Sequence, residues 1–362
     1  GYVVDEMRKQ GLDIPVLVGG AAINRNFARK ISLSDDEDPY SGGVFYCNDA
    51  FEGLSLMNSL SKPDRRDALV MKVRQDAVDY QKRDYVIAQR EREAKKETDA
   101  VARSDVAQLP QIPSPTFWGA RTVTEDIDLA QVFDMIDLNG LYRLNWGIRA
   151  DSTEEYDDLI AKKFDPMRLE LQQECVEKGH LEPKIAYGYW PVVSDANALK
   201  VMSADDPKRV ECVLGFPRQP GKQRLCLADY FQGTESDTTD VIAFQVVTVG
   251  ARSAVVSEAL NSEGHYSKSL YLHGLAVQAA EALAEYNTRR IRAELGISPK
   301  SGLRYSYGYP ACPDMEEQKK LFRLLEPEKT IGVELTEGYQ MTPEASTNAI
   351  FVPHPDAKYY TV

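Results

Sequence analysis

The sequence predicts an α+β protein preceded by a short α/β unit, and three observations support this fold class. Residues 116–362 mix helical and strand patterns without regular βα alternation, which is typical of α+β domains. Near the amino terminus, the apolar run 14–18 is followed directly by Gly19 and Gly20, as in a buried strand of a parallel sheet. Between the two parts, residues 109–115 contain three prolines and cannot be helical.

The composition is that of a globular protein with an acidic balance. The 362 residues include 43 Lys+Arg and 56 Asp+Glu, for a formal net charge of −13. Because nucleic-acid-binding domains carry clustered positive charge, this balance argues against a nucleic-acid partner. No apolar run approaches the ~18 residues that span a membrane, so we expect no membrane partner and a soluble, cytoplasmic protein.

The amino-terminal residues predict the end of an α/β unit. We expect a helix over residues 2–10, closed by Gly11, and then strands over residues 14–18 and 43–46. Two parallel strands do not make a stable sheet by themselves. The pattern therefore favours a fragment whose preceding strands are missing, and the first residue, Gly1, is not Met.

A charged segment and a linker come next. From Lys62 to about Arg103, both charge signs intermix around a narrow apolar stripe, which predicts a long solvated helix. The proline-rich residues 109–115 predict an extended linker and a domain boundary, with Phe117 and Trp118 anchoring the linker against the next domain. We therefore expect three parts: residues 1–60, 61–115 and 116–362.

The third part supplies the predicted α+β elements. Helical patterns cover residues 127–138, 152–179, 251–262, 267–296 and 313–326. Strand patterns cover residues 184–190, 208–214, 241–249, 331–336 and 348–353. The glycine motifs of nucleotide-binding folds and of serine hydrolases are absent. The five cysteines form no C-x-x-C pair and the four histidines form no metal-binding spacing, so no metal site is predicted and free buried thiols are expected.

The strongest local signal is the segment RYSYGYPACP, residues 304–313. Its arginine, three tyrosines, glycine and two prolines predict a rigid extended segment. Tyrosine rings could stack on an aromatic base while the guanidinium of Arg304 binds a carboxylate. A second aromatic cluster, HPDAKYY, covers residues 354–360. From the residues alone, each segment is better explained as a packed, proline-braced loop than as a binding site.

Three segments together resemble a known family. RYSYGYPACPD, LTEGYQMTPEAS and HPDAKYY, in this order and spacing, strongly resemble the carboxy-terminal activation domain of cobalamin-dependent methionine synthase. The front end, IPVLVGGAA followed by FYCNDA, looks like the last strands of that family's flavodoxin-like cobalamin-binding domain. The resemblance implies a C-shaped activation domain around a twisted antiparallel sheet. It also implies a methyltransferase portion that binds S-adenosylmethionine and remethylates cobalamin after the cofactor has oxidised.

The resemblance implies a set of ligand contacts. Arg304 resembles the family's arginine contact to S-adenosylmethionine, Ser306 occupies the position of a backbone contact, and Tyr359 matches a tyrosine near the ligand. Asp137 and Glu281 resemble two carboxylates that face the polar groups of the ligand. No side chain is expected to be catalytic, because the departing thioether leaves neutral and the protein has only to position the groups and exclude water.

Each of the two carboxylates could also have a purely structural role. Asp137, before Leu-Asn-Gly, could simply end a helix, and Glu281 lies opposite the main apolar stripe of its helix, as a solvated glutamate would. Against this role for Glu281, small residues flank it and could line a cleft. Val277 stands where the family commonly has an aspartate, which removes one polar contact.

For cobalamin, the resemblance implies only a partial site. Gly19, Gly20 and Ala50 follow the two predicted strands, where small residues let a bulky ligand approach. Taken alone, the two glycines are better explained by a tight strand-to-helix turn. The family's D-x-H-x-x-G motif, whose histidine binds cobalt, is not in this sequence and is expected upstream. Zinc is expected only in an upstream module.

Partners follow from the same resemblance. We expect the upstream cobalamin and substrate modules of the same enzyme, and flavodoxin or an equivalent reductase as the electron donor. Two alternatives remain open at this point. One is a standalone regulatory module that binds S-adenosylmethionine or a corrinoid without catalysis. The other is an unrelated methyltransferase, which the lack of a glycine-rich strand–loop motif disfavours.

Overall fold

The computed structural model describes most of the chain in two compact units, Gly1–Val101 and Ala102–Val362. The described residues are 2–19, 23–33, 38–47, 50–96, 103–206, 208–220, 223–236 and 238–362, with the backbone alone for 50–51 and 82–96. Each unit has its own buried core.

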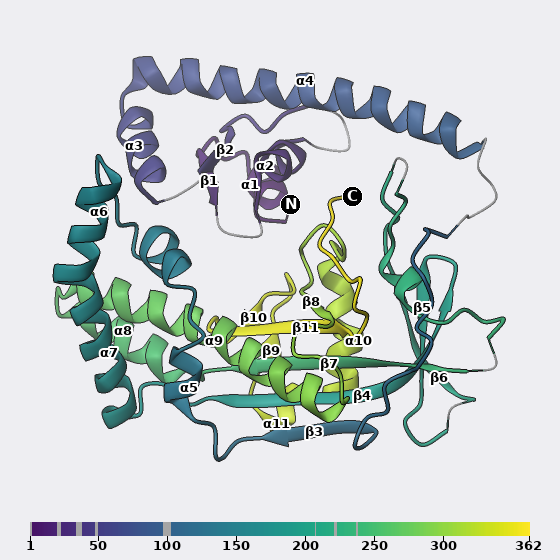
Figure 1. The fold of residues 1–362 in the computed structure, drawn as a ribbon. Coiled ribbons are helices and arrows are strands. Elements are labelled where there is room, and N and C mark those ends of the chain that lie inside the picture. Colours follow the sequence, from purple (N-terminus) through teal and green to yellow (C-terminus); the bar gives the residue numbers. More distant parts are fainter. Residues whose placement is uncertain are drawn as a thin grey trace. The chain divides into compact units, whose positions relative to one another are not determined.

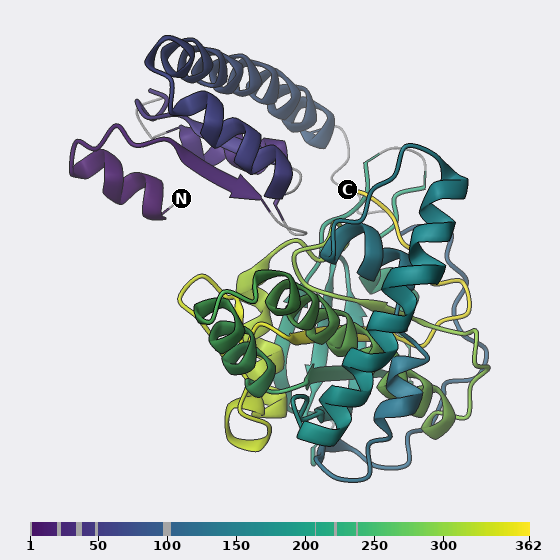
Figure 2. The ribbon, with the colours of Figure 1, turned by 90° about the vertical axis from the view of Figure 1, so that its left-hand side faces the viewer.

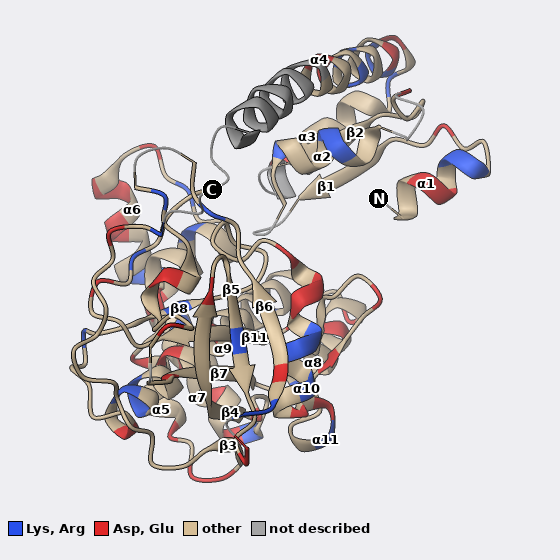
Figure 3. Cartoon of the chain, turned by 90° about the vertical axis from the view of Figure 1, so that its right-hand side faces the viewer, with Lys and Arg blue, Asp and Glu red and all other residues tan. Residues whose placement is uncertain are grey.

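The described residues of the first unit form two parallel strands and four helices (Figure 1). They are α1 (Tyr2–Lys9), β1 (Val16–Gly19), α2 (Arg25–Ser32), β2 (Val44–Cys47), α3 (Ala50–Leu60) and α4 (Pro63–Lys96). The two strands pair in parallel from Val16 with Val44 to Gly19 with Cys47, so the predicted parallel pair is confirmed. Lys, Arg, Asp and Glu are interspersed along the described half of α4, as Figure 3 shows. Both signs therefore alternate on this helix.

The second unit is built on a seven-stranded sheet in which every pairing is antiparallel. The strand order is β6-β5-β4-β7-β11-β8, and β3 pairs with β4. These strands are β3 (Gly119–Val123), β4 (Lys184–Asp195), β5 (Ala198–Met202), β6 (Val210–Gly215), β7 (Asp240–Thr248), β8 (Leu303–Tyr305) and β11 (Ser346–Val352). The short strands β9 (Glu334–Leu335) and β10 (Met341–Thr342) form a separate pair. The predicted α+β class with an antiparallel sheet is confirmed.

Helices cover both faces of this sheet. Its central strands carry apolar side chains on both faces, and each face forms a separate core with the helices that cover it. On β4, Ile185, Tyr187 and Tyr189 belong to one core, whereas Ala186 and Trp190 belong to the other. The first core contains α5 (Leu129–Phe133), α6 (Thr153–Leu159), α7 (Asp165–Lys178), α8 (Arg252–Ser262) and α9 (Tyr266–Glu294). The second contains α10 (Gln318–Leu325) and lies beside α11 (Pro327–Thr330). The sheet is therefore a central layer with a core on each face (Figure 1).

The helix α9 crosses the first face of the sheet and connects it to the outer helices. Its buried residues include Leu272, Leu275, Ala279 and Leu283, which is the predicted apolar stripe. Figure 2 shows the green helices α8 and α9 beside the teal helices α6 and α7. This arrangement holds the middle of α9 rigidly against the sheet.

Some predicted bounds differ from the structure for local reasons. The helix predicted over 127–138 ends at Phe133, and a π-helical turn, Gly140–Asn145, follows it. The helix predicted over 152–179 is present but passes through a π-helical turn, Ile160–Phe164, immediately before Pro166. Proline lacks the N–H that a continuous α-helix would use there. The strands β3, β5 and β8 are absent from the prediction, because they are short and gain their pairing from β4, β6 and β11.

The segment 103–109, here called the strap, docks on the second unit by hydrogen bonds. Arg103 donates to the carbonyl of Phe231 at 2.7 Å, and the Ser104 hydroxyl donates to Asp229 Oδ2 at 2.7 Å. His354 Nε2 lies 2.9 Å from the carbonyl of Ala107. Beyond the strap, Phe117 packs edge-on against two buried tyrosines of β4, as predicted, whereas Trp118 is exposed. The chain is therefore fixed to the second unit well before the proline-rich segment ends.

Candidate functional site

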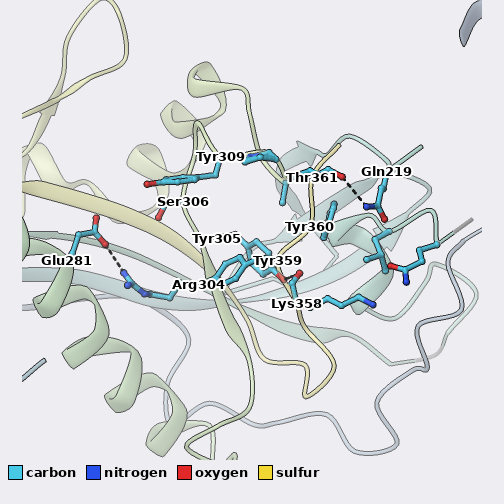
Figure 4. A pocket seen from close by; sticks show the side chains of 14 residues that line it. Gln219, Glu281, Arg304, Tyr305, Ser306, Tyr309, Lys358, Tyr359, Tyr360 and Thr361 are labelled. Atoms are coloured by element: carbon cyan, nitrogen blue, oxygen red, sulfur yellow. Dashed lines mark hydrogen bonds and ion pairs between the residues drawn. The ribbon is translucent and has the colours of Figure 1, made fainter. Parts of the chain in front are cut away.

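A cavity of about 730 Å³ opens in the second unit between β8, α9, a loop and the carboxy-terminal tail (Figure 4). Glu281 and Arg304 lie at one end of it, and Gln219 and Thr361 at the other. The remaining lining residues are Gln223, Leu225, Tyr305, Ser306, Tyr309, Pro310, Ala311, Lys358, Tyr359 and Tyr360. Four residues predicted from the family resemblance, Glu281, Arg304, Ser306 and Tyr359, are thus brought together on its walls.

Arg304 supplies a partly buried positive charge at the cavity wall. Its Nη1 lies 3.6 Å from Glu281 Oε2, and its Nε lies 3.8 Å from Glu285 Oε2. Both separations exceed hydrogen-bond length, and Nη1 is a buried nitrogen without a hydrogen-bond partner in the described structure. A buried donor without an acceptor is costly, so this nitrogen indicates a place where an anionic oxygen would bind.

The position of Arg304 depends on a tight turn before β8. Gly302 has φ +75°, and a Cβ there would come within 2.5 Å of Phe351 Cζ and 2.8 Å of the carbonyl oxygen of Val352. Glycine is the residue that accepts both this dihedral and this close approach. In β8, Arg304 then pairs with Phe351 of β11, so the sheet fixes its backbone.

Aromatic side chains form the middle of the cavity. The rings of Tyr305 and Tyr359 meet edge-on with their centroids 5.5 Å apart, and the Tyr305 hydroxyl donates to the carbonyl of Lys358 at 2.8 Å. Burial raises the pKa of the Tyr305 hydroxyl, which keeps it a neutral donor. Tyr359 and Tyr309 remain largely exposed. Such rings offer flat apolar faces to an aromatic ligand.

Ser306 is held through its backbone. Its carbonyl oxygen accepts a bond from the buried Cys312 thiol at 3.0 Å. Burial raises the pKa of that thiol to about 12, so it stays protonated and can donate. The bond closes the loop that carries Tyr309 over the cavity.

Asp137 lies outside the cavity lining. Its carboxylate accepts the Asn139 N–H at 3.1 Å and its carbonyl oxygen accepts the Leu141 N–H at 2.8 Å. Asp137 thus caps the start of the helical turn that follows it and does not end α5, which stops at Phe133. A Cβ at Gly140 would meet both Asp137 Oδ2, at 2.8 Å, and Gln278 Nε2, at 3.3 Å. Asp137 therefore lies against α9 near Gln278, which is almost one helical turn before Glu281.

The residues predicted for cobalamin are described only in part. A Cβ at Gly19 would lie 2.7 Å from the carbonyl oxygen of Cys47, so the packing of β1 against β2 already requires glycine there. Gly20 lies outside the described residues, as does the side chain of Ala50, whose backbone begins α3. The structure therefore accounts for Gly19 without a ligand.

Several residues of this region escape prediction from the sequence. Glu285 follows Glu281 by four residues on α9, a spacing that places both on one helix face and could have indicated it. Tyr309 belongs to the segment expected to stack on a base, although the family resemblance does not single it out as a contact. Gln219 and Leu225 reach the cavity from a distant loop, and no sequence pattern indicates them.

Two features are absent from the described part of the chain, a membrane-spanning helix and a metal-binding cluster. No helix in the described part of the chain is long and apolar enough to cross a membrane. Within the same residues, no group of three or more His, Cys, Asp or Glu side chains could hold a metal ion. All five cysteines are buried, and Cys175, Cys212, Cys226 and Cys312 form no disulfide.

Comparison with known proteins adds three findings. Residues 120–362 match the family described as "Vitamin B12 dependent methionine synthase, activation domain". Proteins named methionine synthase are similar over nearly the whole chain. The one from Mycobacterium tuberculosis (strain ATCC 25618 / H37Rv) is 35% identical over 399 residues, covering 99% of this chain and 33% of its own. The one from Mycobacterium leprae (strain TN) is 33% identical over 401 residues, with the same coverage.

The chain thus spans about a third of the length of these curated relatives. A solved structure described as "Crystal Structure of the MetH Reactivation Domain bound to AdoHcy" superposes with a TM-score of 0.62 at 24% identity. It covers 69% of this chain and 83% of that one. This likeness shows a shared fold.

Proposed function

The chain belongs to the family of vitamin B12-dependent methionine synthase activation domains, and from this premise we propose that it is the carboxy-terminal part of a methionine synthase. Its second unit, in this proposal, binds S-adenosylmethionine for the reductive remethylation of cobalamin. The relatives named methionine synthase support the enzyme class, since they align with 99% of the chain. The similar solved domain is described as bound to AdoHcy, the demethylated form of the same ligand.

The observation that carries the proposal is the buried Nη1 of Arg304 at the cavity wall, which forms no hydrogen bond within the described residues and only a long ion pair with Glu281. A carboxylate bound there would complete its hydrogen bonding and gain a charge-assisted contact. The cavity volume of about 730 Å³ lies within the ~300–1,000 Å³ range of small-molecule sites. An amino-acid nucleoside such as S-adenosylmethionine offers both a carboxylate for Arg304 and an aromatic base for the tyrosines.

The remaining contacts are assigned by charge. Glu281, whose side chain is 49% exposed, would bind the ligand ammonium. Asp137 lies outside the cavity lining, beside Gly140, and is assigned to the same ammonium by the family resemblance alone. Ser306 would contribute backbone groups and Tyr359 a ring face. Val277 adds no polar contact one turn before Glu281, so these groups carry the polar recognition.

The chemistry proposed for this unit needs no proton transfer. A sulfonium loses its methyl group to a nucleophile and departs as a neutral thioether, so the protein has only to hold the methyl donor and limit water. Glu281 and Arg304 then act by fixing the amino-acid end of the ligand. The electron for the reductive step would come from flavodoxin or an equivalent reductase.

We further propose that residues 1–60 are the end of a flavodoxin-like cobalamin-binding domain, 61–115 a helix and linker, and 116–362 a C-shaped activation domain. The parallel pair β1–β2 with its connecting helix α2 supports the first assignment. The carbonyl of Cys47 already requires glycine at position 19, so this glycine gives the cobalamin contact no separate support. Residues 1–101 also contain no histidine, so we place no step of the reaction on this unit.

Isothermal titration of S-adenosylmethionine and S-adenosylhomocysteine into the whole chain tests the proposal. Saturable binding of one equivalent of each is expected. Adding 5′-methylthioadenosine, which lacks the amino-acid end, should give weaker binding, because the Arg304 contact is lost. No binding of either amino-acid nucleoside at millimolar concentration would contradict the proposal.

A further inference from the structure

Glu285 lies between two arginines, Arg304 and Arg292, and meets a different nitrogen of Arg304 from the one that Glu281 meets. Its Oε2 is 3.8 Å from Arg304 Nε, and its Oε1 accepts a hydrogen bond from Arg292 Nη1 at 3.1 Å. The exposed Arg289 lies farther from the same Oε1, at 3.9 Å. Glu285 is thus a carboxylate shared between Arg304, which lines the cavity, and Arg292, which does not.

Arg292 is itself fixed by the backbone that leads into β8. It is 9% exposed, its Nε donates to the carbonyl of Ser301 at 2.9 Å, and its Nη2 donates to that of Gly302 at 3.2 Å. Its guanidinium also stacks 5.6 Å from the ring centroid of Phe351. All three of its nitrogens are therefore engaged, so Arg292 holds Glu285 and the turn before Arg304 in one arrangement.

Glu281 differs from Glu285 in how it is held. Its side chain is 49% exposed, against 34% for Glu285, and it meets Arg304 Nη1 in a long 3.6 Å ion pair. An exposed carboxylate in one long contact can turn away at little cost. A carboxylate hydrogen-bonded to a buried arginine cannot do so as readily.

We infer that Glu285 is a positioning residue for ligand binding: anchored by Arg292, it holds the Nε edge of Arg304 so that Nη1 stays directed to the cavity. This inference rests on the proposed function, in which Nη1 binds the ligand carboxylate. Glu281 is the exchangeable partner, which leaves Nη1 when the ligand arrives and turns to the ligand ammonium. Glu285 remains in place throughout.

The direction in which Glu285→Gln changes the affinity for a carboxylate ligand distinguishes a positioning role from a simple charge effect. Glu285→Gln removes a negative charge next to Arg304. If Glu285 acted only as a competing charge, the variant would bind a carboxylate ligand more tightly. If Glu285 positions the guanidinium, binding becomes weaker because Arg304 loses its fixed orientation. Glu285→Asp keeps the charge but shortens the reach, so positioning alone predicts weaker binding there too.

The experiment measures the affinities of the whole chain for S-adenosylhomocysteine and for 5′-methylthioadenosine by calorimetry. Glu285→Gln and Glu285→Asp should each lower the affinity for S-adenosylhomocysteine about three- to tenfold and leave the affinity for 5′-methylthioadenosine unchanged. In an Arg304→Ala background, Glu285→Gln should have no further effect. Glu258→Gln on α8 is the matched control, since this glutamate is exposed and distant from the cavity lining.

Each other outcome overturns the inference. Tighter binding of S-adenosylhomocysteine by Glu285→Gln would show that Glu285 acts only as a competing charge. Unchanged binding would show that it has no effect on the ligand. An equal loss for both ligands would show a general structural role, and thermal unfolding of each variant would identify it. If the unsubstituted chain binds neither ligand, the proposed function fails and the inference fails with it.

Discussion

Replacing Arg304 by Ala should selectively weaken ligands that carry a carboxylate. The side chain is 19% exposed and its Nη1 is buried, so a ligand carboxylate would meet a largely desolvated guanidinium. A charge-assisted contact of this kind contributes about 1.5–3 kcal/mol, or roughly 10- to 150-fold in affinity. Glu281 and Glu285 already lie 3.6 and 3.8 Å away and partly neutralise the arginine, which places the expected loss near the lower end.

Calorimetric titration of S-adenosylhomocysteine into Arg304→Ala measures this loss. The affinity of Arg304→Lys should lie between those of the unsubstituted protein and Arg304→Ala, since lysine keeps the charge but not the forked geometry. Arg209→Ala serves as the control, because Arg209 pairs with Glu211 outside the cavity. An unchanged affinity in a folded Arg304→Ala protein would refute the reasoning, and so would an equal loss for 5′-methylthioadenosine.

Four further expectations concern reactivation, stability and domain organisation. In a complete enzyme, Glu281→Gln should weaken reactivation by S-adenosylmethionine while primary methyl transfer stays near normal; equal loss of both would point to a structural role. Gly302→Ala should lower the free energy of unfolding by about 1–3 kcal/mol more than Gly264→Ala, because both have positive φ but only the former meets atoms within 4 Å. Asp229→Asn should cost about 3–5 kcal/mol near neutral pH, because it breaks a buried ion pair. The pKa of the Asp229 carboxyl is lowered overall: burial alone would raise it, but hydrogen bonds from Arg218 and Ser104 to the carboxylate outweigh that effect. Its stabilising effect should therefore be lost as pH falls through the lowered pKa, and denaturation curves of the two proteins should converge in acid. Limited proteolysis should remove residues 1–60 first, since a two-stranded sheet leaves its edges unpaired; equal resistance of both units would contradict this.

The sequence predicted those parts of the molecule that depend on local pattern. The strand pattern over residues 184–190 predicted a strand, and the apolar spacing over 267–296 predicted a long helix with Glu281 off its apolar stripe. The resemblance then named Arg304, which the structure places beside Glu281 on the cavity wall.

Other parts depend on contacts between distant segments. The loop residue Gln219 reaches the cavity because its amide donates to the carbonyl of Thr361 at 3.1 Å, across 142 positions of sequence. The missing hydrogen bond at Arg304 Nη1 likewise depends on the side-chain geometry of α9 and β8 together. Neither feature has a periodicity or a motif that a single sequence could display.

The strap has a practical consequence for recombinant fragments of this protein. A fragment that begins at residue 116, after the proline-rich segment, would lack the partners that Arg103, Ser104 and Ala107 provide. Asp229, which is 1% exposed, would lose two hydrogen bonds from Ser104, and His354, 2% exposed, would lose its carbonyl partner. Because each intramolecular hydrogen bond of this kind contributes about 0.5–1.5 kcal/mol, such a fragment should be less stable to thermal unfolding than one that begins at residue 103.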